Sequence, residues 1–384
     1  MNRMLDAHVE AARRFGTPLY FYDLPRLHTD ARALADAFPD PWLRLYALKA
    51  NGLPGLVREI LAAGFVASAV SRGELELAER AGATADRMVL EGIGKTDADL
   101  VNAARRSAGG APLAWVSLET PEDAAVLAAA AWAAGTRVDV LVRVNPAVSP
   151  ETHSGLAVGA ADSKFGILPE ELPAVIEAGG GPDGPLRWRG IHLHVGSQLG
   201  AIDAWRSAFR IGLRLLELQR ATLPDFDTLD AGGGFPVAMA DDESVPAPSL
   251  FAHAAQAELD AMPEGTRPAR LAIEPGRAVV AGSGWLVGRV LHVRPRETPI
   301  VVLDSGMTEL IRPALYGAIH PMRAATSLGR PIDDGAPDTI RVRVDGPICE
   351  STDTLGFDDF PPLERGDLVA IGMVGAYGSS MAST

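Results

Sequence analysis

A lysine stands in the hexapeptide Tyr46-Ala47-Leu48-Lys49-Ala50-Asn51, in a sequence that otherwise avoids lysine. All but three of its 35 basic residues are arginine. A lysine that loses its proton in an apolar environment can attack an aldehyde and form a Schiff base, whereas arginine stays charged. Lys49 is therefore a candidate for covalent catalysis. The alternative, a lysine that only begins a loop, is equally compatible with the hexapeptide alone.

Polar and glycine-rich segments follow most of the apolar runs that we expect to be strands. Stability does not require such residues there, and in a parallel barrel the carboxyl ends of the strands form the active face. We therefore expect these segments to share one site. They are Lys49, Ser71–Glu74, Gly92–Lys95, Arg143–Asn145, His194–Gln198, Gly232–Gly234 and Glu274–Arg277.

Three adjacent glycines, Gly232 to Gly234, follow one of these runs. Their backbone amides can approach an anion closely, which suits a phosphate group. A tight turn is the alternative explanation for three glycines alone. Because Gly276 and Ser197 follow neighbouring runs, we favour phosphate binding.

Glu274 and His194 are candidates for holding a flat ring. Glu274 follows an apolar run, and a buried carboxylate needs a partner, either a protonated pyridine nitrogen or a core arginine. No second histidine, cysteine or acid at metal-ligand spacing accompanies His194, so we favour packing against a cofactor over metal binding. Lysine, phosphate cradle, ring partner and buried acid together predict a pyridoxal 5′-phosphate pocket and no metal site.

Strand and helix patterns alternate along most of the chain, and its 384 residues favour two domains. Eight repeats over about 250 residues predict a TIM barrel, with a doubly wound open sheet as the alternative. The expected strands are Leu43–Leu48, Phe65–Val70, Arg87–Leu90, Leu113–Leu118, Val138–Val144, Gly190–His194, Thr228–Asp230 and Leu271–Ile273. The expected helices are Leu53–Ala63, Gly73–Arg80, Asp97–Arg106, Pro121–Ala134, Pro169–Ala178, Ala204–Thr222 and Leu250–Ala261.

From about Ala278 the strand patterns follow one another without helices, which predicts an all-β domain. The early strand Leu19–Tyr22 has no place in the barrel, so we expect it to join this sheet. The expected domains are an N-terminal helix and strand (1–24), the barrel (25–277) and the β domain (278–384). The expected β-domain strands are Gly284–Val293, Pro299–Leu303, Thr339–Val344 and Leu368–Ile371.

The composition of the chain excludes some classes of binding partner. A net charge of −14, without runs of lysine or arginine, argues against nucleic-acid binding. No apolar stretch is long enough to span a membrane. The single cysteine, Cys349, excludes an internal disulfide, so we expect a cytoplasmic protein that acts on a small molecule.

The sequence resembles the barrel-type, alanine-racemase-like pyridoxal-phosphate decarboxylases, and within them the diaminopimelate decarboxylases. The matching segments span nearly the whole chain in the family's order, and the last three are specific to the decarboxylases. They are Tyr46–Asn51, Ser71–Glu74, Ser163–Ile167, His192–Gln198, Asp230–Phe235, Glu274–Arg277, Arg312–Gly317, Gly346–Asp353 and Gly375–Ser383.

The resemblance implies roles for single residues. Lys49 would bind the cofactor covalently, His194 would stack on its ring and Glu274 would keep the pyridine nitrogen protonated. The cofactor's phosphate side would be bound by Ser197, Gly234, Gly276, Arg277 and Tyr377. The substrate's distal end would be bound by Arg277, Arg312, Tyr316, Tyr377 and Glu350.

The resemblance also implies a homodimer with shared active sites. Cys349 would reprotonate the substrate carbon, and with Glu350 it would reach in from a second subunit. Without the resemblance, Arg312 would be taken for a surface arginine and Cys349 for a buried small residue. His153 and Lys164 lie in a long loop that we expect to cover the site.

The implied activity is α-decarboxylation of an amino acid with a distal charged group, foremost meso-diaminopimelate to L-lysine. Two departures from the family's pattern favour a decarboxylase of a siderophore or other specialised pathway as the alternative. Ser68 stands where relatives carry aspartate, and Glu91-Gly92-Ile93-Gly94-Lys95 replaces a His-Gly-Asn-Asn-Lys pattern. An amino-acid racemase would not need Cys349 and Glu350. A catalytically silent regulatory homologue should have lost Lys49.

Overall fold

The computed structural model describes residues 2–148, 163–240, 243–325 and 339–383. The chain divides into two compact units, each of which is assembled from segments distant in sequence. One unit contains Met1–Asp30, Val237–Ser244 and Val280–Thr384, and the other contains Ala31–Pro236 and Val245–Val279.

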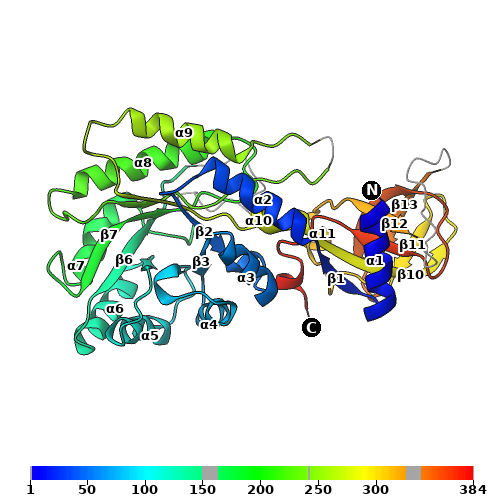
Figure 1. The fold of residues 1–384 in the computed structure, drawn as a ribbon, viewed down its shortest axis with the longest axis horizontal. Helices are drawn as coiled ribbons and strands as arrows, with labels where there is room; N and C mark the ends of the chain where they lie inside the picture. The colour runs from blue at the N-terminus through cyan, green and yellow to red at the C-terminus, as the bar shows by residue number, and fades with distance from the viewer. Residues whose placement is uncertain (1, 149–162, 241–242, 326–338, 384) are drawn as a thin grey trace. The chain divides into compact units, whose positions relative to one another are not determined.

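The larger unit is a closed parallel barrel, in which each strand pairs with the next in sequence order (Figure 1). Pairing of Leu43 with Ala272 joins the first strand to the last. This closure confirms the predicted TIM barrel and excludes the open doubly wound sheet. The strands in the described residues are β2 (Leu43–Ala47), β3 (Val66–Ala69), β4 (Met88–Leu90), β5 (Trp115–Leu118), β6 (Val138–Val144), β7 (Leu186–Leu193), β8 (Thr228–Asp230) and β9 (Arg270–Ile273).

Helices follow the strands and lie around the barrel (Figure 1). Ser71, Thr96 and Thr120 each begin a helix, because their side chains accept a hydrogen bond from the backbone amide three residues later. The helices are α2 (Leu24–Ala37), α3 (Pro54–Ala62), α4 (Arg72–Ala81), α5 (Asp97–Ala108), α6 (Pro121–Ala133), α7 (Leu172–Ala178), α8 (Asp203–Gln219), α9 (Pro248–Asp260) and α10 (Arg277–Val280).

The barrel interior is built in layers. Leu45, Val66, Val89, Trp115, Leu141 and Ala272, from six strands, form one buried apolar cluster. Side chains on a strand alternate between faces, so the residue two positions later points the same way. Two positions after five of these residues the sequence turns polar, at Ser68, Glu91, Ser117, Arg143 and Glu274, all of which are buried. An apolar layer thus underlies a polar layer nearer the carboxyl ends of the strands.

The smaller unit is a sheet with the order β12-β15-β10-β11-β13-β14, to which β1 adds by pairing with β10. The predicted membership of the N-terminal strand is therefore confirmed. Helix α1 (Asn2–Phe15) covers part of this sheet, since His8 packs against Phe21 and Trp285. The strands are β1 (Leu19–Tyr22), β10 (Gly284–Arg294), β11 (Ile300–Leu303), β12 (Met322–Ala325), β13 (Ile340–Asp345), β14 (Thr354–Phe360) and β15 (Leu368–Ile371).

Two of these strands, β12 and β14, were not predicted. The sequence of β12 is Met-Arg-Ala-Ala, without a β-branched residue, and β14 contains Gly356 and two aspartates. Such residues are poor strand formers, and pairing with β15 and β13 overrides that local preference.

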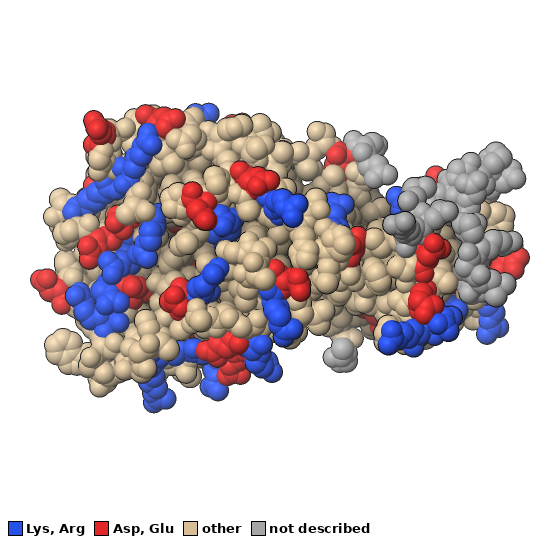
Figure 2. All heavy atoms as spheres, viewed as in Figure 1, with Lys and Arg blue, Asp and Glu red and all other residues tan. Residues whose placement is uncertain are grey.

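No helix within the described ranges is long and apolar enough to cross a membrane. On the face drawn in Figure 2, basic and acidic side chains lie interspersed over the surface. Among the described residues drawn on that face, basic side chains form no patch of the kind that binds nucleic acid.

A buried carboxylate organises the loop between β13 and β14. Asp353 accepts hydrogen bonds from the backbone amides of Met307 (2.6 Å) and Ile348 (2.8 Å). A Cβ atom on Gly346 would lie 2.3 Å from the same carboxylate, so only glycine allows this approach. The loop that carries Cys349 and Glu350 is thereby tied to the turn after β11.

We predict that Asp353→Asn lowers the free energy of unfolding by about 1–3 kcal/mol, because the amide turns one acceptor into a donor that faces a buried N–H group. Urea denaturation followed by circular dichroism would measure the change. Asp359→Asn, at an exposed aspartate on β14, is the matched control and should leave stability unchanged. Equal stability of both variants would contradict a fixing role for Asp353.

Candidate active site

Lys49 lies on a short 3-10 turn, η1 (Leu48–Ala50), directly after β2. Leu48 and Ala50 are buried in the turn while the Lys49 side chain is exposed. The Tyr46 hydroxyl donates to the Asn51 carbonyl (2.9 Å) and closes the turn. The backbone amide of Ala47 donates to the Pro275 carbonyl (3.3 Å), which links this turn to the end of β9. The structure thus presents Lys49 at the carboxyl end of the barrel.

Glu274 is the centre of the polar layer. The Ser68 hydroxyl lies 3.3 Å from its Oε1 atom, and His192 Nε2 lies 3.1 Å from its Oε2 atom. Ser117 in turn hydrogen bonds His192 Nδ1 (2.8 Å), which fixes the imidazole. Burial raises the pKa of Glu274, but attraction to His192 and hydrogen bonding within the polar layer lower it by more. Glu274 therefore stays ionised.

His194 is a partly buried, neutral ring beside Glu274. Burial lowers its pKa to about 4, against a smaller opposing effect from Glu274. Its Nδ1 atom accepts a hydrogen bond from the Gly233 amide (3.2 Å) and lies 3.5 Å from Glu274 Oε2. An uncharged imidazole held by the backbone is suited to pack flat against an aromatic ring.

Glycine is required where the chain turns after β8. Gly232 has φ +70°, and a Cβ atom there would lie 2.1 Å from the Leu193 carbonyl oxygen. Gly234 has φ +106°, and its Cβ would lie 2.6 Å from the Leu199 side chain. Both conformations are disfavoured for residues with side chains. The triglycine thus forms a bare backbone surface at a strand end.

Ser197 and Arg277 meet beside this surface, because Arg277 Nη2 donates to Ser197 Oγ (3.4 Å). Arg277 begins α10 and is buried. At Gly276 a Cβ atom would lie 3.2 Å from the Cβ atoms of Ala47 and Ala50. The barrel unit therefore brings its predicted site residues to neighbouring strand ends.

The smaller unit gathers three other predicted residues. Arg312 and Tyr316 lie on the short helix α11 (Arg312–Tyr316). The Arg312 guanidinium carbon is 5.2 Å from the centre of the Tyr316 ring and 5.8 Å from that of Tyr377. Burial lowers the pKa of Arg312, although a guanidinium stays charged.

Two expectations that rest on the residues alone, without the family resemblance, are wrong. Arg312 is buried, not a surface arginine, and Cys349 is exposed, not a buried small residue. Glu350 is exposed beside it. Lys164 is exposed near the Phe165 ring, and His153 lies outside the described residues.

Sequence reasoning missed three residues of the polar layer: Glu91, His192 and Asp230. With Glu274 they place their ligand-type atoms within 4.8 Å of one another. The alternation His192-Leu193-His194 could have indicated that both histidines face the barrel interior. The association of Glu91 with Glu274 could not be read from the sequence, because it depends on strand register and barrel closure.

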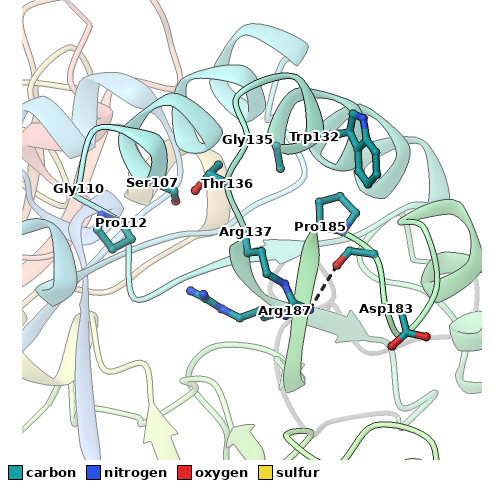
Figure 3. Close-up of a pocket in the computed structure, with 12 residues that line it drawn as sticks. Ser107, Gly110, Pro112, Trp132, Gly135, Thr136, Arg137, Asp183, Pro185 and Arg187 are labelled. Carbon is teal, nitrogen blue, oxygen red and sulfur yellow. Dashed lines mark hydrogen bonds between the residues drawn. The ribbon is translucent and has the colours of Figure 1, made fainter.

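A surface pocket of about 860 Å³ lies at the other ends of the strands (Figure 3). Gly135–Arg137 precede β6 and Asp183–Pro185 precede β7, and Arg137 donates to the Gly184 carbonyl (3.3 Å). None of the predicted site residues lines this pocket, so it is separate from the candidate site.

Comparison with known proteins identifies a family. Residues 24–281 match the family described as "Pyridoxal-dependent decarboxylase, pyridoxal binding domain". The diaminopimelate decarboxylase of Deinococcus radiodurans is 38% identical over 376 residues, covering 98% of this chain and 89% of the relative. That of Aquifex aeolicus is 33% identical over 376 residues, covering 97% and 85%.

Solved structures show the same relationship. The diaminopimelate decarboxylase of Helicobacter pylori, complexed with L-lysine, superposes with a TM-score of 0.87 at 29% identity, covering 97% of this chain and 90% of that chain. A lysine/ornithine decarboxylase from Vibrio vulnificus, complexed with putrescine, gives a TM-score of 0.80 at 27% identity, covering 100% and 94%.

The family match covers the whole barrel that carries Lys49 and Glu274, and the full-length relatives extend it through the second unit. The chain therefore belongs to the pyridoxal-dependent decarboxylases, which are carboxy-lyases that use pyridoxal 5′-phosphate.

Proposed function

We propose that this protein decarboxylates meso-diaminopimelate at its α-carbon and releases L-lysine. The observation that carries the proposal is the buried Arg312. Among the described residues no carboxylate forms an ion pair with it, and its nearest charged or titratable neighbours are Tyr316 and Tyr377. A buried charge without a protein partner calls for a ligand of opposite charge. The distal carboxylate of diaminopimelate supplies one, whereas lysine and ornithine have none at that end.

Lys49 is proposed to hold the cofactor through its aldehyde carbon, with the His194 ring against the cofactor's ring. Glu274 would pair with the pyridine nitrogen, since it is a buried ionised carboxylate whose direct donors are side chains of the same layer. Bound pyridoxal 5′-phosphate supplies a sink for the electrons that carbon dioxide leaves behind. These donor groups fit that cofactor.

The phosphate is proposed to lie against the bare backbone at Gly234 and Gly276, with Ser197, Arg277 and Tyr377 as donors. The left-handed backbone of Gly234 (φ +106°) supports this placement, because turns with such glycines can aim successive backbone amides at an anion. Arg277 and Tyr377 are also proposed to bind substrate, because guanidinium and hydroxyl groups can donate to a carboxylate as well as to a phosphate.

On the substrate side, Arg312, Tyr316 and Arg277 would bind the distal carboxylate, because guanidinium groups hold carboxylates in two-point contacts. Glu350 would bind the distal amine, and Cys349 would deliver a proton to the α-carbon. We propose that both come from the second subunit of a homodimer. Their exposure in the single chain and their fixed loop support this role. We also propose a cytoplasmic location, on the ground of the single cysteine.

A decarboxylase of a specialised pathway is the second candidate. Ser68 and Glu91, the residues that depart from the family's pattern, both lie in contact with the Glu274 layer. A substrate other than diaminopimelate would also explain why Ser68 and Glu91 differ from the family's pattern. Carbon dioxide release distinguishes the two candidates.

We predict that the purified, cofactor-loaded protein releases carbon dioxide from meso-diaminopimelate, and not from lysine, ornithine, arginine or glutamate offered in parallel. The product should be L-lysine, identified by chromatography. If the protein has cofactor bound but releases no carbon dioxide from any of the five compounds, the result would favour a substrate from a specialised pathway.

Arg312→Met should raise KM for meso-diaminopimelate roughly 10–100-fold with a smaller change in kcat, because the distal carboxylate is bound alike before and after the reaction. Steady-state kinetics measure both constants. Arg341→Met is the matched control, since Arg341 is an exposed arginine of the same unit. An unchanged KM for the Arg312 variant would remove Arg312 from the substrate site.

Lys49→Ala should abolish covalent cofactor attachment. After borohydride reduction and dialysis, the wild-type protein should retain the cofactor's absorbance and the variant should lose it, because no amine remains to form a reducible bond. Lys164→Ala, which removes another exposed lysine, should retain it. Retention in the Lys49 variant would show that the Schiff-base assignment is wrong.

Shared active sites can be tested by mixing two variants, each of which lacks one of the proposed catalytic residues. Lys49→Ala and Cys349→Ala should each be nearly inactive as homodimers. Random reassembly of equal amounts should restore about a quarter of wild-type activity, because half of the dimers then contain one intact site. Cofactor binding by the Cys349 variant should be normal. No recovery, after subunit exchange has been verified, would place Cys349 and Lys49 of one active site in the same subunit.

A further inference from the structure

Three carboxyl groups and one imidazole share a small volume under the proposed cofactor site. The oxygen and nitrogen atoms of Glu91, Asp230, Glu274 and His192 lie within 4.8 Å of one another, and all four residues are buried. Three negative charges at this separation in a buried site would repel strongly. The roles proposed above use Glu274 and leave Glu91 and Asp230 unexplained.

The hydrogen bonds indicate where protons reside. The Ser68 hydroxyl reaches Glu91 Oε2 (3.1 Å) and Glu274 Oε1 (3.3 Å), but one hydroxyl proton cannot serve both acceptors. The carboxyl oxygens of Glu91 and Glu274 lie within 4.8 Å of each other in a buried site, and two ionised carboxylates there would repel, so a proton belongs on one of them. Among the described residues no donor reaches Glu91 Oε1. His192 Nε2 lies 3.1 Å from Glu274 Oε2 and can donate to it, so the charge belongs on Glu274 and the proton on Glu91.

We propose that Glu91 is a positioning residue which, as a neutral carboxylic acid, donates a hydrogen bond to Glu274 and holds that carboxylate ionised and oriented toward the cofactor's pyridine nitrogen. This inference rests on the proposed role of Glu274. Glu91 itself touches no reacting atom. Ser68 completes the arrangement, because its hydroxyl donates to the remaining carbonyl oxygen of the acid.

The pKa values agree with this assignment. Burial raises the pKa of Glu91 well above its usual range, and the neighbouring Glu274 and Asp230 raise it further. Burial likewise raises the pKa of Asp230. The titratable and charged groups that face Glu91 are Glu274 after β9, Asp230 on β8, His192 on β7 and Lys95 after β4.

A group whose pKa is raised on folding contributes stability at low pH that is lost as pH rises toward the folded-state pKa. Ionisation of Glu91 would place a second charge against Glu274. Glutamine cannot ionise, yet its amide can donate to Glu274 while its carbonyl accepts from Ser68. Glu91→Gln should therefore mimic the neutral acid, and Glu91→Leu should remove the donor.

The first experiment needs no cofactor. Infrared spectra of cofactor-free wild type at neutral pH should contain carbonyl absorption of protonated carboxylic acid, and Glu91→Gln should remove the part of it that comes from Glu91, whatever Asp230 contributes. Glu258→Gln on α9 is the matched control: hydrogen bonds from Arg210 and Arg206 outweigh burial and lower the pKa of Glu258 to about 2, so no protonated acid is lost there. The melting temperature of Glu91→Gln relative to wild type should rise as the pH increases above about 4.5, the ordinary pKa of a glutamate, because the unfolded wild type then loses a proton that the folded state keeps.

The second experiment uses the holoenzyme. Glu91→Gln should keep kcat within about threefold of wild type and flatten the basic limb of its pH profile, whereas Glu91→Leu should lose about 10–100-fold with the cofactor still covalently attached. An unchanged infrared band in Glu91→Gln, or equal losses in both variants, would overturn the proposal. Inactivity of the wild type on every amino acid would overturn the proposed function and leave the infrared result standing.

Discussion

The structure depends on keeping one carboxylate, Glu274, ionised inside a closed barrel. Burial of a charge is costly unless hydrogen bonds and opposite charges compensate it. Barrel closure provides the compensation, since it brings His192 from β7 to the end of β9, together with Glu91 after β4 and the Ser68 hydroxyl that lies between the two carboxyl groups. An open sheet would separate the first and last strands and leave Glu274 without Ser68. The ionised state of Glu274 therefore depends on the closed barrel.

Side chains alternate between the two faces of each strand, and this places the apolar residues that stabilise the barrel in a different layer from the polar residues of the candidate site. The apolar layer at Leu45, Val66 and Leu141 packs the barrel, and the residues two positions further on can then be polar without opening the core. Above that layer, glycines at 232 and 234 bring backbone where a side chain would collide. Polar residues can thus stand at the strand ends without disturbing the packing beneath them.

Much of the barrel could be predicted because each strand is a short run of apolar, often β-branched residues between helical patterns. Lys49 stood out because lysine is rare here, and Gly232–Gly234 because three glycines have few structural uses. Strand β12 lacks any β-branched residue, so only its pairing with β15 makes it a strand. Glu91 and Asp230 join Glu274 only through strand register. Arg312 and Cys349 were found by resemblance, because no local pattern shows that one is buried and the other exposed.

Arg312 and Glu274, the two charged groups of the proposed site, have different functions. Decarboxylation leaves the distal carboxylate of the substrate untouched, so Arg312 would bind substrate and product equally. Such uniform binding selects the substrate without lowering the barrier to reaction. It also predisposes the site to retain L-lysine. The barrier must instead fall where charge moves, at the cofactor nitrogen beside Glu274. In the proposed site, a buried cation would therefore set specificity and a buried anion the rate, and the proton proposed on Glu91 would keep that anion in place.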